Sequence, residues 1–209
     1  MKYKIRYFTG DINVDNGIMA HILSECKLYT GTDRKNYYKR FKNKYPTSKQ
    51  ISATWGYTRR GKMSDTKWRK ESDYFAYYKT KVMSDNPELE KVFTEYAKKY
   101  LPKNFFWSQV QINFNYDIPK HKDSCNQGFS YIIGFGDYEG GELVIDFDGY
   151  EKKVDIHDNP YTFNGSEYEH WVAPFTGDRW SLVFFTHHSK EQLRDLKEKK
   201  ININNINEL

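Results

Sequence analysis

The chain has few of the features that would place a protein outside the cell or in a membrane. Only two of its 209 residues are cysteine, Cys26 and Cys125, which is too few for a disulfide framework and favours reduced thiols. No apolar run approaches the roughly 20 residues that a membrane-spanning helix needs. No apolar segment of a secretory signal follows Met1. These absences predict an intracellular protein, cytoplasmic or nuclear, that has no membrane partner.

Aromatic residues, in contrast, are abundant. They make up 18% of the chain, with 18 Tyr, 14 Phe and 5 Trp. Tyrosine and tryptophan bury a large area and keep a polar group, so they suit both a core and a base-stacking surface. A chain of this length can form one domain with a substantial core. We expect a single domain over residues 1–209, divided into a basic, helical N-terminal elaboration (1–104), a β core (105–188) and a C-terminal helix and tail (189–209).

Positive charge is concentrated in one part of the chain. Residues 31–70 contain 13 Lys and Arg against two Asp, a net charge of +11, whereas the whole chain carries +5. Such a segment attracts polyanions, and its interleaved aromatic residues offer faces on which bases can stack. Its candidate nucleic-acid contacts are Trp55, Tyr57, Arg59 and Arg60. A solvated, lysine-rich surface explains the same composition equally well.

The sequence before residue 105 predicts helices and one strand. Residues 35–44 can form a basic helix, and residues 51–57 a short strand. Another helix is indicated between Asn86, which can cap it, and Pro102, which would end it. Apolar positions recur in this helix at helical spacing, and they are Leu89, Val92, Phe93, Tyr96 and Tyr100. We expect the helix to pack against the sheet that follows.

From residue 105 to residue 185 the hydrophobic period changes to two, which is typical of strands. The expected strands are 107–115, 129–135, 142–147, 151–156, 160–163, 170–172 and 179–185. Regular short strands with glycine turns indicate a sandwich or barrel, and jelly rolls and cupins are the class that carries internal metals. The predicted fold is therefore α+β and mainly β. It has a jelly-roll core, supporting N-terminal helices and a C-terminal helix.

Two histidines and one carboxylate form the most informative pattern. His121 and Asp123 are separated by one residue, so on extended backbone both side chains can point to the same side. His170 follows 47 residues after Asp123, in an aromatic strand. Two histidines and a carboxylate, with positions left open, are the ligand set of non-heme Fe(II) in oxygenases. Singly, an exposed loop histidine and a core histidine are better explanations; together the three residues favour a metal site.

The last strand offers a second pattern. Arg179 and Ser181 share one face of this strand, so a guanidinium and a hydroxyl can bind one carboxylate together. Asn113 and Gln111 likewise share one face of the strand before His121 and are candidates to contact a cosubstrate or a substrate. A solvent-facing sheet surface explains that pair equally well.

The remaining histidines have weaker claims to a function. His157 lies on an expected turn and is kept as an alternative metal ligand. His21, His187 and His188 are expected to be structural or exposed to solvent.

The stretch from Val110 to Phe185 resembles the double-stranded β-helix core of the Fe(II)/2-oxoglutarate dioxygenases. The matching elements are His121-x-Asp123, Gly140-Gly141-Glu142-Leu143, His170 and Arg179-x-Ser181. Three short segments are most similar to the TET/JBP-like nucleic-acid base hydroxylases and their algal and viral relatives, and they span residues 109–113, 134–138 and 175–179. The nine-residue interval between His170 and Arg179, and the glycine pair before Glu142, instead follow the prolyl-4-hydroxylases.

This resemblance implies an enzyme that binds Fe(II) through His121, Asp123 and His170. It implies that Arg179 and Ser181, with Asn113 nearby, hold 2-oxoglutarate. O2 would be the second cosubstrate and ascorbate a candidate reductant, and the products would be succinate, CO2 and a hydroxylated substrate.

The implied substrate is a methylated pyrimidine base in DNA or RNA, which must be flipped out of a duplex to react. A prolyl or lysyl side chain of a protein is the alternative. A catalytically inactive binding module is disfavoured, because all three ligands and the arginine are present.

Overall fold

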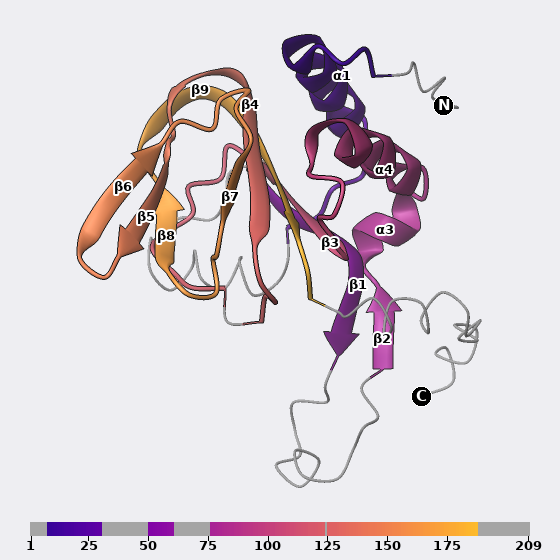
Figure 1. Ribbon diagram of the computed structural model, residues 1–209. Helices are drawn as coiled ribbons and strands as arrows, with labels where there is room; N and C mark the ends of the chain where they lie inside the picture. The colour runs from indigo at the N-terminus through magenta and orange to yellow at the C-terminus, as the bar shows by residue number, and fades with distance from the viewer. Residues whose placement is uncertain (1–7, 31–49, 61–75, 124, 188–209) are drawn as a thin grey trace, which may run out of the picture.

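The computed structural model describes residues 8–30, 50–60, 76–123 and 125–187 (Figure 1). Within these ranges the protein is mainly β, with three helices and two antiparallel sheets. The basic helix expected at residues 35–44 and the helix expected after residue 189 both lie outside the described residues. In the described part of the chain, Cys26 and Cys125 are free thiols.

The helices are α1 (Ile12–Ser24), α3 (Lys81–Asp85) and α4 (Leu89–Tyr100). None of these described helices is both long and apolar enough to cross a membrane. The prediction that Asn86 caps α4 is wrong, because Glu88 occupies the N-cap position and makes no side-chain cap hydrogen bond. Asn86 instead ends α3, and its side chain hydrogen-bonds the backbone of Lys27 and Val82. The Asn86 side chain could have capped α4, but it instead makes a tertiary contact with the segment after α1.

Six strands form the larger sheet, in the order β2-β1-β3-β9-β4-β7. Their bounds are β1 (Ile51–Arg60), β2 (Ala76–Lys79), β3 (Gln109–Phe114), β4 (Ser130–Gly140), β7 (Tyr161–Phe163) and β9 (Phe175–Phe185). The smaller sheet has the order β6-β5-β8, and its strands are β5 (Leu143–Phe147), β6 (Tyr150–Val154) and β8 (Glu169–Val172). The helices lie on one side of the larger sheet and the smaller sheet lies on the other (Figure 1).

The two faces of the larger sheet pack differently. The outer face contacts the helices through a large apolar cluster that includes Phe93 and Tyr96 of α4 and Phe184 of β9. The space between the two sheets holds a smaller apolar cluster, to which Ile132 and Leu143 belong. Burial at roughly 25 cal/mol per Å² makes the outer cluster the main stabilising contact of the fold. The smaller cluster leaves part of the inner face free for polar groups.

Candidate metal centre and its cavity

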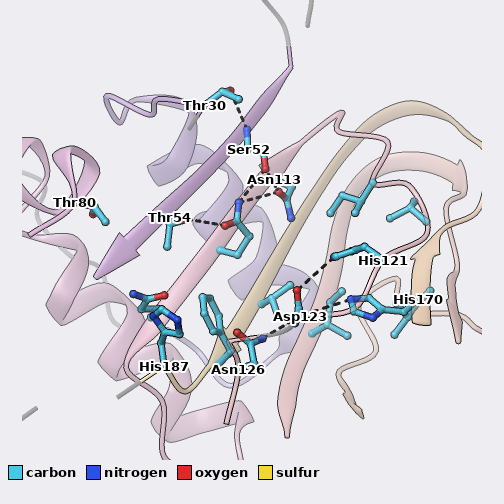
Figure 2. A pocket seen from close by; sticks show the side chains of 18 of the residues that line it. Thr30, Ser52, Thr54, Thr80, Asn113, His121, Asp123, Asn126, His170 and His187 are labelled. Carbon is cyan, nitrogen blue, oxygen red and sulfur yellow. Dashed lines mark hydrogen bonds and ion pairs between the residues drawn. The ribbon is translucent and has the colours of Figure 1, made fainter. Parts of the chain in front are cut away.

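A cavity of about 710 Å³ opens between the two sheets, within the usual range for a small-molecule site. One side of it is lined by polar side chains of β1 and β3, and another by His121, Asp123 and His170 (Figure 2). Apolar residues complete the lining, and they include Ile118, Ile132, Leu143, Phe163, Val183 and Phe185. The residues predicted to bind a metal therefore face a space that can hold a ligand.

Backbone pairing brings His121 beside His170. The two residues form an isolated antiparallel bridge, in which each backbone N–H donates to the carbonyl of the other, at 3.0 and 2.9 Å. The backbone N–H of Asp123 donates to the carbonyl of Gly165 at 2.8 Å. These bonds fix the short segment after β3 against β8 and the turn before it. His121 and His170, which are 49 positions apart along the chain, thus meet at one point.

The three side chains converge. Asp123 Oδ1 lies 3.4 Å from His121 Nε2, and Asp123 Oδ2 lies 3.6 Å from His170 Nε2. One potential ligand atom from each residue lies within 4.8 Å of the others. Among the described residues this is the one group of three or more His, Cys, Asp or Glu side chains so arranged. The convergence predicted from the sequence spacing is present in the structure.

Both imidazoles are oriented by backbone carbonyls. His121 Nδ1 lies 2.8 Å from the carbonyl oxygen of Pro119, and His170 Nδ1 lies 3.1 Å from that of Tyr168. A proton on each Nδ1 satisfies these contacts and leaves the Nε2 lone pair directed toward Asp123. Metal-binding histidines commonly have such an outer partner, which fixes their tautomer. The donor set therefore fits a divalent metal.

Burial favours the neutral form of His170. Its side chain is nearly inaccessible, and desolvation is the main cause that lowers its pKa, followed by the proximity of His121, while Asp123 acts in the opposite direction. A lowered pKa favours the neutral imidazole at pH 7. Neutral imidazole is the form that ligates metals.

Two further residues support Asp123, and sequence reasoning missed both. The side-chain amide of Asn126 donates to Asp123 Oδ2 at 3.0 Å. Gly165 leaves the room that the site needs, since a Cβ at this position would lie 2.8 Å from Asp123 Oδ2 and 3.0 Å from the His170 ring. Asn126 follows Asp123 by three residues, a spacing typical of a turn, which was the only sequence signal for it.

Arg179 lies at the closed end of the space between the sheets. It is 1% exposed, and its Nη2 donates to the carbonyl of Gly141 at 3.0 Å. Among the described residues, its Nε has no hydrogen-bond partner and no carboxylate forms an ion pair with its guanidinium. Burial lowers the pKa of Arg179, with nearby Tyr138 opposing the shift, yet a guanidinium keeps its proton in proteins. A buried cation without a counter-charge is costly and fits an anionic ligand.

Tyr138 is a second group at this end that the sequence analysis did not single out. The Arg179 guanidinium lies 5.4 Å from the centre of its ring, and its buried hydroxyl has no hydrogen-bond partner. His157 stacks on the same ring at 4.3 Å, with its Nε2 3.0 Å from the carbonyl of Gly136. His157 therefore belongs to this end of the fold, and the alternative assignment of it as a metal ligand is wrong.

Ser181 lies two residues from Arg179 on β9 and is paired with Asn113 on β3. Arg179 and Ser181 have the same parity on β9 as Val183 and Phe185, which line the cavity, although Arg179 and Ser181 do not themselves line it. Asn113 does line the cavity, and its amide donates to Ser181 Oγ at 3.3 Å. Of the two explanations for Gln111 and Asn113, the solvent-facing surface does not hold, because these residues are 6% and 1% exposed.

The four candidate nucleic-acid contacts do not form a single exposed patch. Trp55 is 4% exposed and packs against Phe93 and Trp107, so it belongs to the outer core and is not available for stacking. Tyr57 is half-buried against the same core. Arg59 and Arg60 lie on β1, but their side chains are outside the described part of the structure. His187, expected to be structural or exposed, is partly exposed and lines the cavity.

No known protein-family model matches the chain, and no curated protein matches it. Among solved structures, an oxidoreductase of the 2OG-Fe(II) oxygenase family from Burkholderia pseudomallei is similar, with a TM-score of 0.51 and 15% identity over 83% of this chain and 78% of that one. NgTET1 in complex with 5mC DNA gives a TM-score of 0.45 and 17% identity over 81% and 77%. A Pseudomonas putida prolyl-4-hydroxylase gives 0.33 and 18% over 48% and 62%.

The first of these similarities confirms the resemblance at the level of the fold. The protein has the fold of a 2OG-Fe(II) oxygenase. The other two TM-scores are too low to carry an argument about either subfamily.

Proposed function

We propose that the protein is an Fe(II)- and 2-oxoglutarate-dependent dioxygenase that hydroxylates a methylated pyrimidine base in DNA or RNA. In this proposal the two sheets are a double-stranded β-helix core within a single domain. The observation that carries the proposal is the convergence of His121, Asp123 and His170 at one cavity, together with the buried Arg179, which has no carboxylate partner among the described residues. Similarity of fold alone would not assign an activity.

Each ligand residue has a defined part in the proposed reaction. His121 and His170 would present neutral Nε2 atoms and Asp123 a carboxylate, which leaves the remaining coordination positions free for cosubstrates. When bound, Fe(II) supplies the capacity to use O2 for oxidation of a C–H bond, coupled to conversion of 2-oxoglutarate to succinate and CO2. Asn126 orients Asp123 through its amide, and the absence of a side chain at Gly165 keeps the ligand face open.

The cosubstrate would span the distance from the metal ligands to the closed end. Arg179 would bind the distal carboxylate of 2-oxoglutarate, with Ser181 and Tyr138 as further donors. This arrangement would satisfy the Arg179 Nε and the Tyr138 hydroxyl, the two groups that lack partners here. Asn113, hydrogen-bonded to Ser181, would hold that hydroxyl in place. The apolar residues around the metal ligands would exclude water from the reacting groups.

A nucleic-acid substrate is supported by charge and by cavity size. The net charge of +11 over residues 31–70 would attract a phosphate backbone. A cavity of about 710 Å³ can accept a single flipped base. Replacing Arg59 and Arg60 together by alanine should weaken nucleic-acid affinity and reduce its salt dependence by about one to two phosphate contacts.

The decisive experiment combines turnover with product analysis. The protein is incubated with Fe(II), ascorbate, O2 and 2-oxoglutarate, together with an oligonucleotide that contains 5-methylcytosine or a peptide that contains proline and lysine. We expect succinate in both reactions and a mass gain of one oxygen only on the base. Hydroxylation of the peptide alone would move the substrate to protein, and the absence of succinate throughout would overturn the proposed enzyme.

A further inference from the structure

Two rows of side chains cross the inner face of the larger sheet, in register across β1, β3 and β9. The first row lies two residues from Arg179 along β9 and consists of Ser52, Asn113 and Ser181. The second row lies one step farther from Arg179 and consists of Thr54, Gln111 and Val183. Residues two apart on a strand are separated by about 7 Å. We therefore expect that the second row does not contact the distal carboxylate of a small dicarboxylic acid bound at Arg179.

Gln111 joins the two rows. Its Oε1 accepts from the Thr54 hydroxyl at 2.7 Å, and its Nε2 donates to Ser52 Oγ at 3.0 Å and to Asn113 Oδ1 at 3.1 Å. Thr54, Gln111, Ser52 and Asn113 all line the cavity, and Figure 2 labels Thr54, Ser52 and Asn113 on this wall. The hydrogen bonds hold the Gln111 carboxamide in one orientation, so its groups are already placed when a ligand enters.

The polar wall lies opposite an apolar face of the same strand. The other face of β3 carries Val110 and Ile112, both fully buried in the outer core. Gln111 is 6% exposed, although a buried carboxamide costs free energy unless it is hydrogen-bonded. Gln111 Oε1 and Thr54 Oγ1 each keep a free lone pair after the bonds described above. A polar wall with spare acceptors, facing a cavity, fits recognition of a ligand.

The charge of the lining limits which ligand fits. Asp123 is the one carboxylate among the described lining residues, and it belongs to the metal centre. A lysyl ammonium would therefore enter without a counter-charge of its own, which is unfavourable. A prolyl ring carries no donor and would leave the free lone pairs of Gln111 Oε1 and Thr54 Oγ1 desolvated without a partner. A neutral ring that bears an N–H donor on its edge, such as a pyrimidine base, can donate to the free lone pairs of both residues.

We propose that Gln111 and Thr54 determine substrate specificity by hydrogen-bonding the edge of the pyrimidine ring, while the neighbouring Asn113–Ser181 row serves the cosubstrate. This inference rests on the proposed function and deepens it, because it assigns the recognition of the base to two named side chains. It divides one polar wall into two sites with different ligands.

The test separates the two Michaelis constants. Succinate formation is measured with Thr54→Val and Gln111→Met, using an oligonucleotide that carries one 5-methylcytosine and, in a second arm, thymine at the same position. For the base that the wild type hydroxylates, the oligonucleotide KM should rise about five- to tenfold in Thr54→Val and at least tenfold in Gln111→Met, since one hydrogen bond is lost in the first and a buried group is left unpaired in the second. The KM for 2-oxoglutarate should change less than about twofold.

Matched controls are available at exposed positions. Thr176→Val on β9 and Gln127→Met make the same chemical changes on the surface and should leave both constants unchanged. If Gln111→Met does not fold, the Thr54→Val result alone tests the inference. The Thr54 hydroxyl bonds only Gln111 among the described contacts, so its removal should disturb the fold little.

Four outcomes bear on the inference. A rise confined to the oligonucleotide KM supports it. Equal rises in both constants, or no rise in either, would overturn it and leave the proposed dioxygenase intact. Hydroxylation of a peptide that is insensitive to both variants would also overturn it. A wild type that forms no succinate would overturn the proposed function and this inference together.

Discussion

The outer and inner faces of the larger sheet are built from the same strands but differ in polarity. On β9, Leu182 and Phe184 point outward into the apolar core beneath the helices, whereas Arg179 and Ser181 point inward and are equally buried. The outer face gains stability from apolar area. The inner face buries polar side chains at positions where apolar side chains would have a lower desolvation free energy. The comparison indicates that the outer face maintains the fold and the inner face carries the chemistry.

The largest expected effect comes from the inner face. Asp123→Ala should abolish succinate formation, because the carboxylate is the only anionic ligand of the proposed metal. The side chain is about a quarter exposed, so the thermal unfolding midpoint should shift little in the metal-free protein. Full succinate production by this variant would show that the ligand assignment is wrong.

The second prediction concerns the outer face, where a substitution should reduce stability rather than remove a group that takes part in the reaction. Phe184 is fully buried against Phe93, Tyr96 and Trp107. Phe184→Ala should lower the free energy of unfolding by about 3–5 kcal/mol, the usual range for a large-to-small change in a core. Denaturant unfolding measures this loss. A neutral Phe184→Ala would contradict the role given to the outer face.

A smaller effect is expected at the closed end of the inner face. Arg179→Met keeps much of the side-chain volume and removes the charge. The KM for 2-oxoglutarate should rise about 10- to 100-fold, since hydrogen bonds between charged groups contribute roughly 1.5–3 kcal/mol. Steady-state kinetics at saturating oligonucleotide test this prediction. An unchanged KM for 2-oxoglutarate would show that Arg179 does not bind the distal carboxylate of the cosubstrate.

The smallest effect concerns the support of the metal ligand. Asn126→Ala removes one hydrogen bond to Asp123 and should weaken Fe(II) affinity about tenfold, the lower end of the range for such outer partners. Turnover at saturating Fe(II) should recover most of the wild-type rate. A loss that added iron does not restore would mean that Asn126 acts on a later step.

The comparison of the two faces also shows what sequence can predict. Alternation on β3 correctly separated Val110 and Ile112 from Gln111 and Asn113, because the two-residue period is local. It could not decide whether the polar face meets water or a second sheet, since that depends on β5 and β8, which lie far along the chain. The same limit applies to Trp55, whose aromatic side chain fitted a stacking surface as well as a core until α4 was seen to cover it.

The candidate site was predicted best where one chemical function needs a fixed set of residues. His121, Asp123 and His170 could be proposed from residue type and spacing, because three metal ligands have few substitutes. Asn126, Gly165 and Tyr138 were missed, because a carboxamide, a glycine and a phenol serve many purposes. Only their positions relative to the metal ligands and Arg179 give them a role.

The most direct test of the central claim is the stoichiometry of metal binding under anaerobic conditions. Calorimetric titration of the wild type with Fe(II) should give one ion per chain, and Asp123→Ala and His170→Ala should lose that site while retaining the fold. Asp137→Ala, an exposed carboxylate on β4, should bind like the wild type. Unchanged binding of one Fe(II) by the Asp123 and His170 variants would contradict the account.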